Sequence, residues 1–167
     1  MNEFTQQRAG FFKRLAAMVY DALIAVAVGM LAALIFIIAL TVLLETGLLS
    51  KQGFAHVNDL IQASVVYKTI IQVWVAFWVI GFYLWFWKNG GQTLGMRAWR
   101  LRLYQLDPNA KQQMTYPRLL LRLISALGGF GTLLVLIDFK TKLALQDRVA
   151  GTQMLSLSKE QNHHKNW

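Results

Sequence analysis

The stretch that decides the fold is ALIAVAVGMLAALIFIIALTVLL, residues 22–44, which contains no formal charge. Only Gly29 and Thr41 interrupt its apolar character. A helix of this length measures about 35 Å, and the hydrocarbon core of a bilayer is about 30 Å thick. A cleaved signal peptide would have an apolar region of only about 7–15 residues. The run therefore predicts a retained helix that crosses a membrane, over residues 15–44.

The composition agrees with a bilayer environment. The chain has 167 residues, of which 56% are hydrophobic and 15% charged, whereas soluble domains carry about 25% charged residues. Seventeen basic and eight acidic residues give a net charge of +9, and a basic, apolar, aromatic-rich chain favours a membrane over nucleic acid. The absence of cysteine excludes disulfides and a thiol nucleophile. We expect an all-α polytopic membrane protein that is not an enzyme and has no metal site or cofactor.

A second spanning helix is predicted over residues 65–87. Lys68 and Gln72 lie near its start, and the last fifteen residues are uncharged and rich in aromatic side chains. The aromatic cluster at residues 83–87, followed by Lys88, is typical of an interfacial belt with a snorkelling cation. An aromatic box that stacks on a cofactor is the alternative, but no polar group converges with these rings.

The third hydrophobic segment, residues 118–137, is interrupted. Arg122 lies in its first third, and the run Gly-Gly-Phe-Gly occupies residues 128–131. Each glycine weakens a helix by about 1 kcal/mol relative to alanine, and membranes tolerate such breaks only where the freed backbone groups find partners. Two interpretations stay open: a kinked span, or a re-entrant pair of half-helices. The fold is thus a small bundle of two spans plus a broken segment.

Basic residues indicate the orientation in the membrane. Basic residues are in excess before the first helix and over residues 88–122. Between the first two helices, acidic residues balance the basic ones. We expect a protein of a bacterial plasma membrane. The positive-inside rule then places its N-terminus in the cytoplasm and residues 45–64 outside. Lys140, Lys142 and Arg148 favour a cytoplasmic C-terminus as well. A re-entrant third segment would satisfy this, because it returns the chain to the same side.

Two short strands are predicted on that side. Trp99, Leu101 and Leu103 alternate with polar residues, and Leu155 and Leu157 alternate with serines. Each strand would be marginal alone, so pairing them into a small cytoplasmic hairpin-like element is the economical solution. The alternative is that both segments are loops.

Asp21 is the charge that most needs a partner. An aspartate inside a spanning helix costs about 2.5–3.5 kcal/mol, so it should face protein and not lipid. Arg14 lies two turns earlier on the same face, about 10.5 Å along the helix axis, and would need its full side chain to reach. Arg122, Lys68 and the Asp147-Arg148 pair are the other candidate partners. The charges either hold the helices together or relay a proton or an ion.

Small residues follow the same helix face. Ala17, Ala25, Gly29 and Ala33 form a ridge that allows close approach of another helix. We expect a homo-oligomer or a complex with another membrane protein. The basic cytoplasmic residues are expected to contact anionic lipid headgroups and not nucleic acid.

Three ordered motifs carry a resemblance to the RDD membrane-protein family: AGFFKRLAA at residues 9–17, GQTLGMR at 91–97 and QDRVAGT at 146–152. The resemblance covers about residues 8–158. We take residues 1–158 as one transmembrane domain and residues 159–167 as a polar C-terminal tail. The family is named for one arginine and two aspartates. Arg14 and Asp21 match the first two, and Asp147 matches the last, with Asp138 the weaker alternative.

The resemblance implies transport of an unidentified ligand or monovalent cation/proton exchange. The alternative is a non-transporting scaffold or an accessory subunit of a larger membrane complex. We further hypothesise that Arg14 bridges both acids, Asp21 and Asp147, and that Arg148 shares the charge balance.

Overall fold

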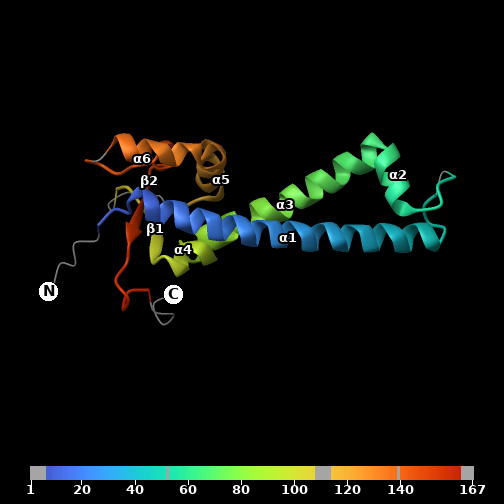
Figure 1. Cartoon of the computed structure of the whole chain (residues 1–167), viewed down its shortest axis with the longest axis horizontal. Helices are drawn as coiled ribbons and strands as arrows, with labels where there is room; N and C mark the ends of the chain where they lie inside the picture. Colours follow the sequence, from blue (N-terminus) through green and yellow to red (C-terminus); the bar gives the residue numbers. More distant parts are fainter. Residues whose placement is uncertain (1–6, 52, 108–113, 139, 163–167) are drawn as a thin grey trace. The chain divides into compact units, whose positions relative to one another are not determined.

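A computed structural model describes residues 7–51, 53–107, 114–138 and 140–162 (Figure 1). The chain forms two compact units. Residues 24–82 make up the first, here called the hairpin unit, and residues 1–23 with 83–167 make up the second, the terminal unit. The two longest helices contribute residues to both units.

The two predicted spanning helices are confirmed. α1 (Phe11–Glu45) and α3 (Val65–Asn89) are both long and apolar enough to cross a membrane. α1 begins four residues before the predicted start, and its 35 residues measure about 52 Å, more than the hydrocarbon core requires. Large apolar side chains such as Val26, Met30 and Phe77 are exposed on these helices, as expected of surfaces that face lipid.

Inside the hairpin unit, α1 and α3 make close contact at small residues. A Cβ added at Gly29 would lie 3.3 Å from a methyl group of Val75. The indole Nε1 of Trp74 donates to the carbonyl of Ala32 over 2.9 Å, while Ala25 and Ala33 are only half-buried. The small-residue ridge therefore permits close helix packing as predicted, but α3 of the same chain already occupies it at Gly29, so that position is not available to a second protein.

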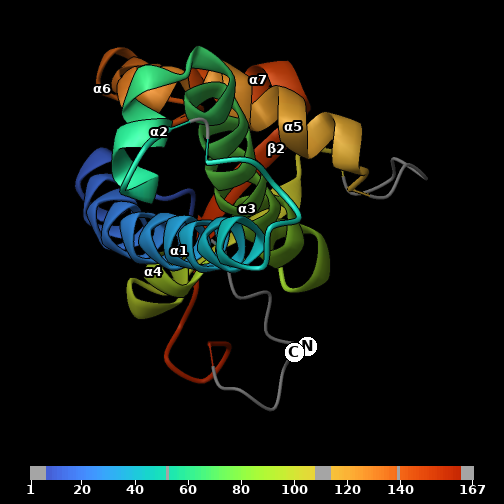
Figure 2. The same ribbon diagram turned by 90° about the vertical axis from the view of Figure 1, so that its right-hand side faces the viewer.

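A short helix in the connector was not predicted. α2 (Val57–Ala63) is the labelled short helix of Figure 2. It buries Leu60 against Leu40 and Leu44 at the end of α1, with Tyr67 of α3 packed alongside. Seven residues form a helix too short to be stable alone, so this apolar contact accounts for its presence. It covers the end of the hairpin unit.

The terminal unit contains the remaining elements, in chain order α4 (Leu94–Ala98), β1 (Leu101–Gln105), α5 (Tyr116–Ser125), η1 (Leu127–Leu133), α6 (Leu134–Ile137), α7 (Leu145–Ala150) and β2 (Thr152–Ser156). β1 and β2 pair antiparallel, with Leu101 opposite Ser156 and Gln105 opposite Thr152. The predicted pairing is confirmed, although the second strand starts three residues earlier than expected, at Thr152.

The chain just before α1 adds to the other edge of β2. The Ala9 amide donates to the Met154 carbonyl over 2.9 Å, and the Ser156 amide donates to the Gln7 carbonyl over the same distance. β2 is thus paired on both sides, which removes an exposed strand edge and fixes the start of α1 against the sheet.

The core of the terminal unit lies between the sheet and the helices. Leu101 and Leu103 of β1 pack with Met154 of β2, with Leu119 of α5 and with Trp87 near the end of α3. The prediction of an interfacial belt is wrong for Trp87, which is only 8% exposed, because the sheet and α5 cover it. Trp85, in contrast, is 57% exposed.

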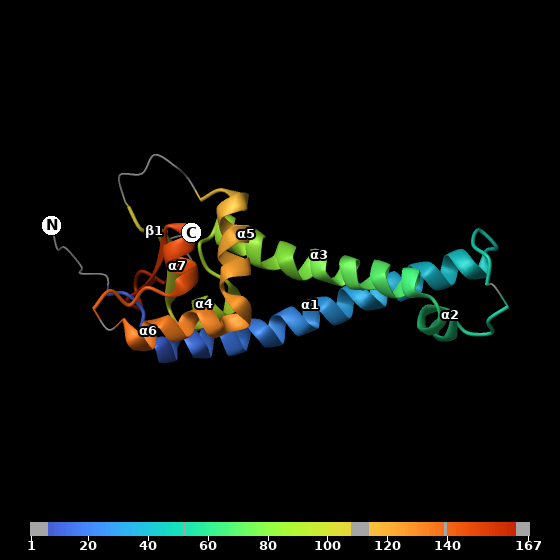
Figure 3. The ribbon, with the colours of Figure 1, turned by 90° about the horizontal axis from the view of Figure 1, so that it is seen from above.

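The third hydrophobic segment breaks at the predicted glycines. α5 and the η1–α6 segment are bent by 80° relative to one another (Figure 3). Gly128 and Gly129 adopt φ values of 63° and 109°, which side chains with a Cβ rarely tolerate. A Cβ at Gly129 would also lie 2.4 Å from the Met18 methyl group. The predicted polar tail is described only to residue 162.

Candidate functional site

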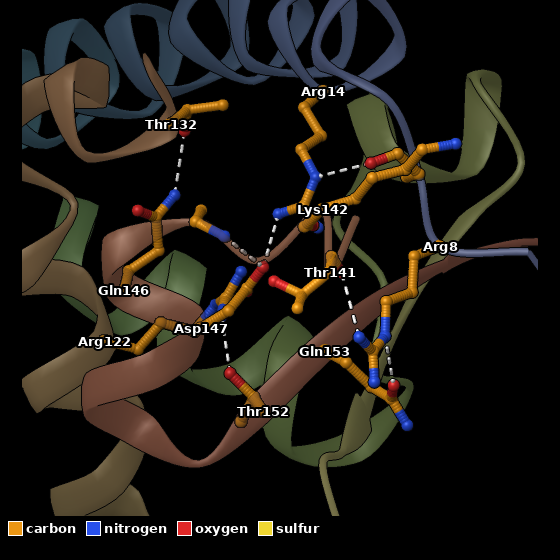
Figure 4. A network of polar contacts seen from close by, with 12 residues as sticks. Arg8, Arg14, Arg122, Thr132, Thr141, Lys142, Gln146, Asp147, Thr152 and Gln153 are labelled. Atoms are coloured by element: carbon orange, nitrogen blue, oxygen red, sulfur yellow. Dashed lines mark hydrogen bonds and ion pairs between the residues drawn. The ribbon is translucent and has the colours of Figure 1, made fainter. Parts of the chain in front are cut away.

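Three predicted residues meet inside the terminal unit. Asp147 of α7 is fully buried and accepts from two guanidinium groups, Nη1 of Arg14 at 2.6 Å and Nη1 of Arg122 at 2.5 Å (Figure 4). Each carboxylate oxygen takes one of these arginines. The cluster therefore ties α1, α5 and α7 together through one carboxylate.

Further hydrogen bonds support this cluster. Arg14 donates through Nε to the Ala9 carbonyl at 3.0 Å and through Nη2 to the Lys142 carbonyl at 3.1 Å. Arg122 donates to the Thr152 hydroxyl at 2.6 Å. The Ala144 amide, which precedes α7, donates to Asp147 at 3.1 Å. Such extensive bonding is what allows charged groups to be stable when buried.

Asp147 stays ionised in this setting. Burial by itself raises the pKa of the carboxyl, but the neighbouring guanidinium groups of Arg122 and Arg14 outweigh it and hold the pKa below the ordinary value of 3.8. Two cations around one anion leave the cluster with a net charge of +1.

Asp21 belongs to a separate set of hydrogen bonds. Its side chain is 5% exposed and accepts from the Thr93 hydroxyl at 2.5 Å and from the Gly95 amide at 2.8 Å. Thr93 also caps α4, since its Oγ1 accepts from the Met96 amide. Gly95 has to be glycine, because a Cβ there would lie 2.4 Å from the Ala17 carbonyl oxygen and 2.8 Å from the Asp21 carboxyl.

The predicted partners of Asp21 are therefore wrong. Within the described residues, no hydrogen bond or ion pair joins Asp21 to Arg14, Arg122, Lys68 or the Asp147-Arg148 pair. Charge balance suggested a cation, whereas the fold supplies neutral donors from the N-cap and first turn of α4. The hypothesis that Arg14 bridges both acids fails at Asp21 for the same reason.

The supporting residues lie elsewhere. Arg148 forms its ion pair with Asp138 and not with the buried cluster. Asp138 also accepts from the Thr141 amide and hydroxyl, and these bonds, the largest contribution, lower the pKa of this carboxyl. Lys68 is exposed near the start of α3 in the hairpin unit. None of the three contributes to the Asp147 cluster.

A cavity of about 290 Å³ lies beside Asp21 within the terminal unit. Its walls are mostly apolar, with charged and polar groups at a few points. It is lined by Arg14, Ala17, Met18, Asp21, Ala22, Tyr83, Trp87, Met96, Arg122, Leu123, Ala126, Gly128, Gly129, Thr132, Gln146 and Met154. Apolar walls with a small number of placed polar groups are the common form of small-molecule sites.

Two residues of the cavity lining each have a buried polar atom that lacks a hydrogen-bond partner among the described residues. These atoms are the indole Nε1 of Trp87 and the amide Oε1 of Gln146. The Nε2 of the same glutamine donates to the Thr132 hydroxyl at 2.8 Å, and the Arg122 guanidinium lies 5.5 Å from the centre of the Trp87 ring. Neither Trp87 nor Gln146 was predicted as a site residue.

The family model of the RDD family matches residues 8–152. The chain belongs to the RDD family. A search of the curated proteins and a search of the solved structures found no match for it. In this RDD protein, the matched segment contains Arg14, Asp21 and both candidates for the last signature position. Of those two, Asp147 joins the arginine in the buried cluster, and Asp138 lies at the surface.

The residues that sequence reasoning missed were partly visible in the RDD motifs. Thr93 and Gly95 fall in the motif at residues 91–97, and Gln146 begins the motif at residues 146–152. A threonine just before a short helix is also a common N-cap. Gly95 and Asp21 lie 74 residues apart in the chain, so no local sequence pattern predicts their contact.

Proposed function

We propose that this RDD protein is a non-enzymatic membrane transport unit, in which the cavity beside Asp21 is the substrate site and Asp21 carries a proton or a monovalent cation. The observation that supports it is the bonding of Asp21. This carboxyl is buried and lines the cavity, and among the described residues it accepts from two neutral donors, the Thr93 hydroxyl and the Gly95 amide.

The physical argument rests on charge neutralisation. A buried carboxylate is costly unless a cation or a proton neutralises it. The two buried arginines of the terminal unit already neutralise Asp147. Asp21 has two hydrogen bonds and no ion pair within the described residues, so a proton or a small cation from the cavity supplies the missing charge. Exchange of one for the other is the step that couples two fluxes.

The sheet supports a proposal for the orientation in the membrane. β1 precedes the broken α5–η1–α6 segment and β2 follows it, and the two strands are hydrogen-bonded along their length. This pairing supports a re-entrant segment, because both strands then lie on one side of the membrane. The positive-inside rule favours the cytoplasmic side of a bacterial plasma membrane for that end, and therefore for both termini.

We propose that anionic lipids and a second membrane-protein surface are the partners of this protein. Exposed cations of the terminal unit, among them Lys13, Arg100 and Lys140, suit anionic headgroups, which contribute about 1 kcal/mol per cation near the membrane surface. A homo-oligomer or a second membrane protein would supply the protein surface that two full spans and one broken segment lack. Mass measurement of the detergent-solubilised protein over a range of concentrations tests the oligomer.

A scaffold or accessory subunit is the second candidate. The extensive bonding of Arg14, Arg122 and Asp147 favours it, since such a buried cluster is typical of a structural tie and needs no substrate. A scaffold requires Asp21 only for its bonds to Thr93 and Gly95.

Cation/proton flux in everted membrane vesicles distinguishes the two candidates. With the wild type, we expect a monovalent cation to dissipate an imposed pH gradient across the vesicle membrane. This dissipation should be lost with Asp21→Asn, which keeps the shape of the side chain. Asp138→Asn is the matched control, since Asp138 is a surface aspartate outside the cavity lining. Absence of flux in the wild type, in membranes where the protein is present and folded, would favour the scaffold.

A further inference from the structure

The cavity beside Asp21 adjoins an apolar groove of about 210 Å³ between the first turns of α1 and the η1 segment. Phe11 and Leu15 of α1 and Phe130 and Leu133 of η1 form its apolar walls. Phe130 and Leu133 are exposed, so the groove opens on an apolar outer surface of the terminal unit. Walls of this kind favour an apolar chain over a polar group.

The groove and the cavity share part of their lining. Met18, Gly128, Gly129 and Thr132 belong to both. The Met18 methyl group packs on Gly129, where a Cβ would lie 2.4 Å from it, and the Met18 sulfur accepts from the Thr132 hydroxyl at 3.5 Å. The flexible side chain of Met18 is therefore the boundary between the groove and the cavity.

One face of α1 leads from the groove to Asp21. Phe11, Leu15, Met18 and Asp21 follow one another at spacings of four, three and three residues, so each lies one turn beyond the last on the same face. The series extends about 15 Å along the helix axis. A molecule that reaches from the groove past Met18 therefore meets the carboxyl of Asp21, which lines the cavity.

The cavity offers aromatic rings beside this carboxyl. Tyr83 and Trp87 both line it, with ring centres 5.5 Å apart, and Tyr83 lies close enough to Asp21 for an electrostatic interaction. Aromatic rings attract organic ammonium ions. An alkali ion instead needs several oxygens to replace its hydration shell, and among the described residues of the lining Asp21 is the one acid.

The two arginines of the lining are held by another acid. Arg14 and Arg122 both donate to Asp147, and the Arg122 guanidinium also lies 5.5 Å from the centre of the Trp87 ring. Arg14 lies two turns before Asp21, about 10.5 Å along the helix axis. A cation at Asp21 is thus separated from Arg14 by the same two turns, and Tyr83 is the ring nearest to its charge.

We infer that the substrate of the Asp21 site is a monovalent organic ammonium ion with an apolar tail. The ammonium head lies against the Asp21 carboxylate and the Tyr83 ring, and the tail passes Met18 into the groove between Leu15 and Phe130. This inference rests on the proposed function, because it takes the same carboxyl as the substrate site and names the class of cation. The opening of the groove lets the tail enter from the bilayer.

The test uses the full chain in lipid nanodiscs and radiolabelled hexyltrimethylammonium, whose charge is the same at every pH. Binding to empty nanodiscs is subtracted, because the probe also partitions into lipid. We expect saturable binding that Asp21→Asn weakens about tenfold or more, whereas the surface variant Asp138→Asn keeps the wild-type affinity. Equal affinity in folded Asp21→Asn would overturn the inference, since apolar contacts alone would then hold the probe.

Competition on the wild type gives a second measurement if Asp21→Asn fails to fold. Unlabelled butyl-, pentyl- and hexyltrimethylammonium should displace the probe, with affinity rising about threefold for each added methylene group. Hexanol and potassium chloride at the same concentrations should leave the probe bound. Displacement by hexanol or by potassium as effective as that by hexyltrimethylammonium would overturn the inference, because a neutral chain or a bare cation would then suffice.

A variant of the groove tests the position of the tail. Phe130→Ala should reduce the gain in affinity from butyl to hexyl and leave butyltrimethylammonium binding nearly unchanged. Phe12→Ala is the matched control, because Phe12 lies outside the groove lining and is 80% exposed, against 73% for Phe130. An unchanged gain in Phe130→Ala would overturn the assignment of the groove to the tail.

Binding and flux can fail independently. Proton-coupled flux of sodium or potassium without ammonium binding overturns the substrate class and keeps the transport proposal. Ammonium binding that depends on Asp21, without flux of any cation, keeps the binding site and overturns transport.

Discussion

Arg14 and Asp147 lie 133 residues apart in the chain, and their side chains form a hydrogen-bonded ion pair of 2.6 Å in which both are fully buried. The pair joins the first helix of the protein to the last one. Arg122 completes it from α5, so that the first half of the broken third segment and the helix that follows this segment are held to the start of α1.

Removal of one member of this pair should lower the free energy of unfolding substantially. Asp147→Ala leaves two buried guanidinium groups without an anion, and such a change typically costs about 3–5 kcal/mol. We expect Arg14→Ala to be destabilising as well, and the double variant to lose about 0.5–3 kcal/mol less than the sum of the single losses. Unfolding in detergent, followed by circular dichroism, measures this.

The Arg14 and Asp21 pair provides the control cycle. These residues share no bond, so the losses from Arg14→Ala and Asp21→Ala should add to within about 0.5 kcal/mol. Strong coupling in this second cycle, or additive losses in the first, would show that the assignment of partners is wrong.

Acid should destabilise the protein through Asp147. Its pKa is lowered in the folded state from 3.8, so the folded protein holds this proton less tightly than the unfolded chain does. The stability contributed is fully present above about pH 3.8, and it is lost as the pH falls below that value toward the folded pKa. Unfolding free energies measured from pH 3 to pH 6 should fall at the acid end.

Asp147→Asn tests the origin of that acid loss. The variant should be less stable near neutral pH and should show a flatter profile below pH 4, because its amide does not titrate. A variant with the same acid slope as the wild type would assign the loss to other carboxyl groups.

Much of this architecture was predictable from the sequence because its signals are local. The apolar lengths of α1 and α3, the glycine break at residues 128–131 and the period-two strands each follow from neighbouring residues. The hydrogen-bond partners of Asp21 could not be predicted from neighbouring residues. A neutral hydroxyl and a backbone amide at residues 93–95 carry no charge signal, and only the fold brings them 2.5 and 2.8 Å from the carboxyl. The buried position of Trp87 was missed for the same reason, since its cover comes from β1, β2 and α5.

Gly95→Ala should disturb the Asp21 site directly. The added methyl group would lie 2.4 Å from a backbone oxygen of α1, and overpacking of this kind typically costs about 1–3 kcal/mol. Gly81→Ala is the matched control, because a Cβ at this helical position meets nothing within 4 Å and alanine favours a helix. Thermal unfolding of both purified variants compares the two. Equal melting temperatures would mean that α4 does not approach α1 as closely as described.

The absence of cysteine allows single-cysteine mapping of the membrane orientation. Leu48 and Lys159 are both exposed. Leu48→Cys, in the connector between α1 and α2, should react with an impermeant maleimide in intact cells, and Lys159→Cys, after β2, should react only once the membrane is opened. Labelling of Lys159→Cys from outside would contradict the re-entrant third segment.

The most direct test of the central claim is cation/proton flux by purified protein in proteoliposomes, with Asp21→Asn compared with the wild type at equal amounts of folded protein. An amide keeps one acceptor for Thr93 or Gly95 but cannot carry a proton or neutralise a cation. The account predicts that Asp21→Asn inserts and folds while its flux falls to the level of protein-free vesicles, and that Asp138→Asn keeps the wild-type rate. Undiminished flux in folded Asp21→Asn would contradict it.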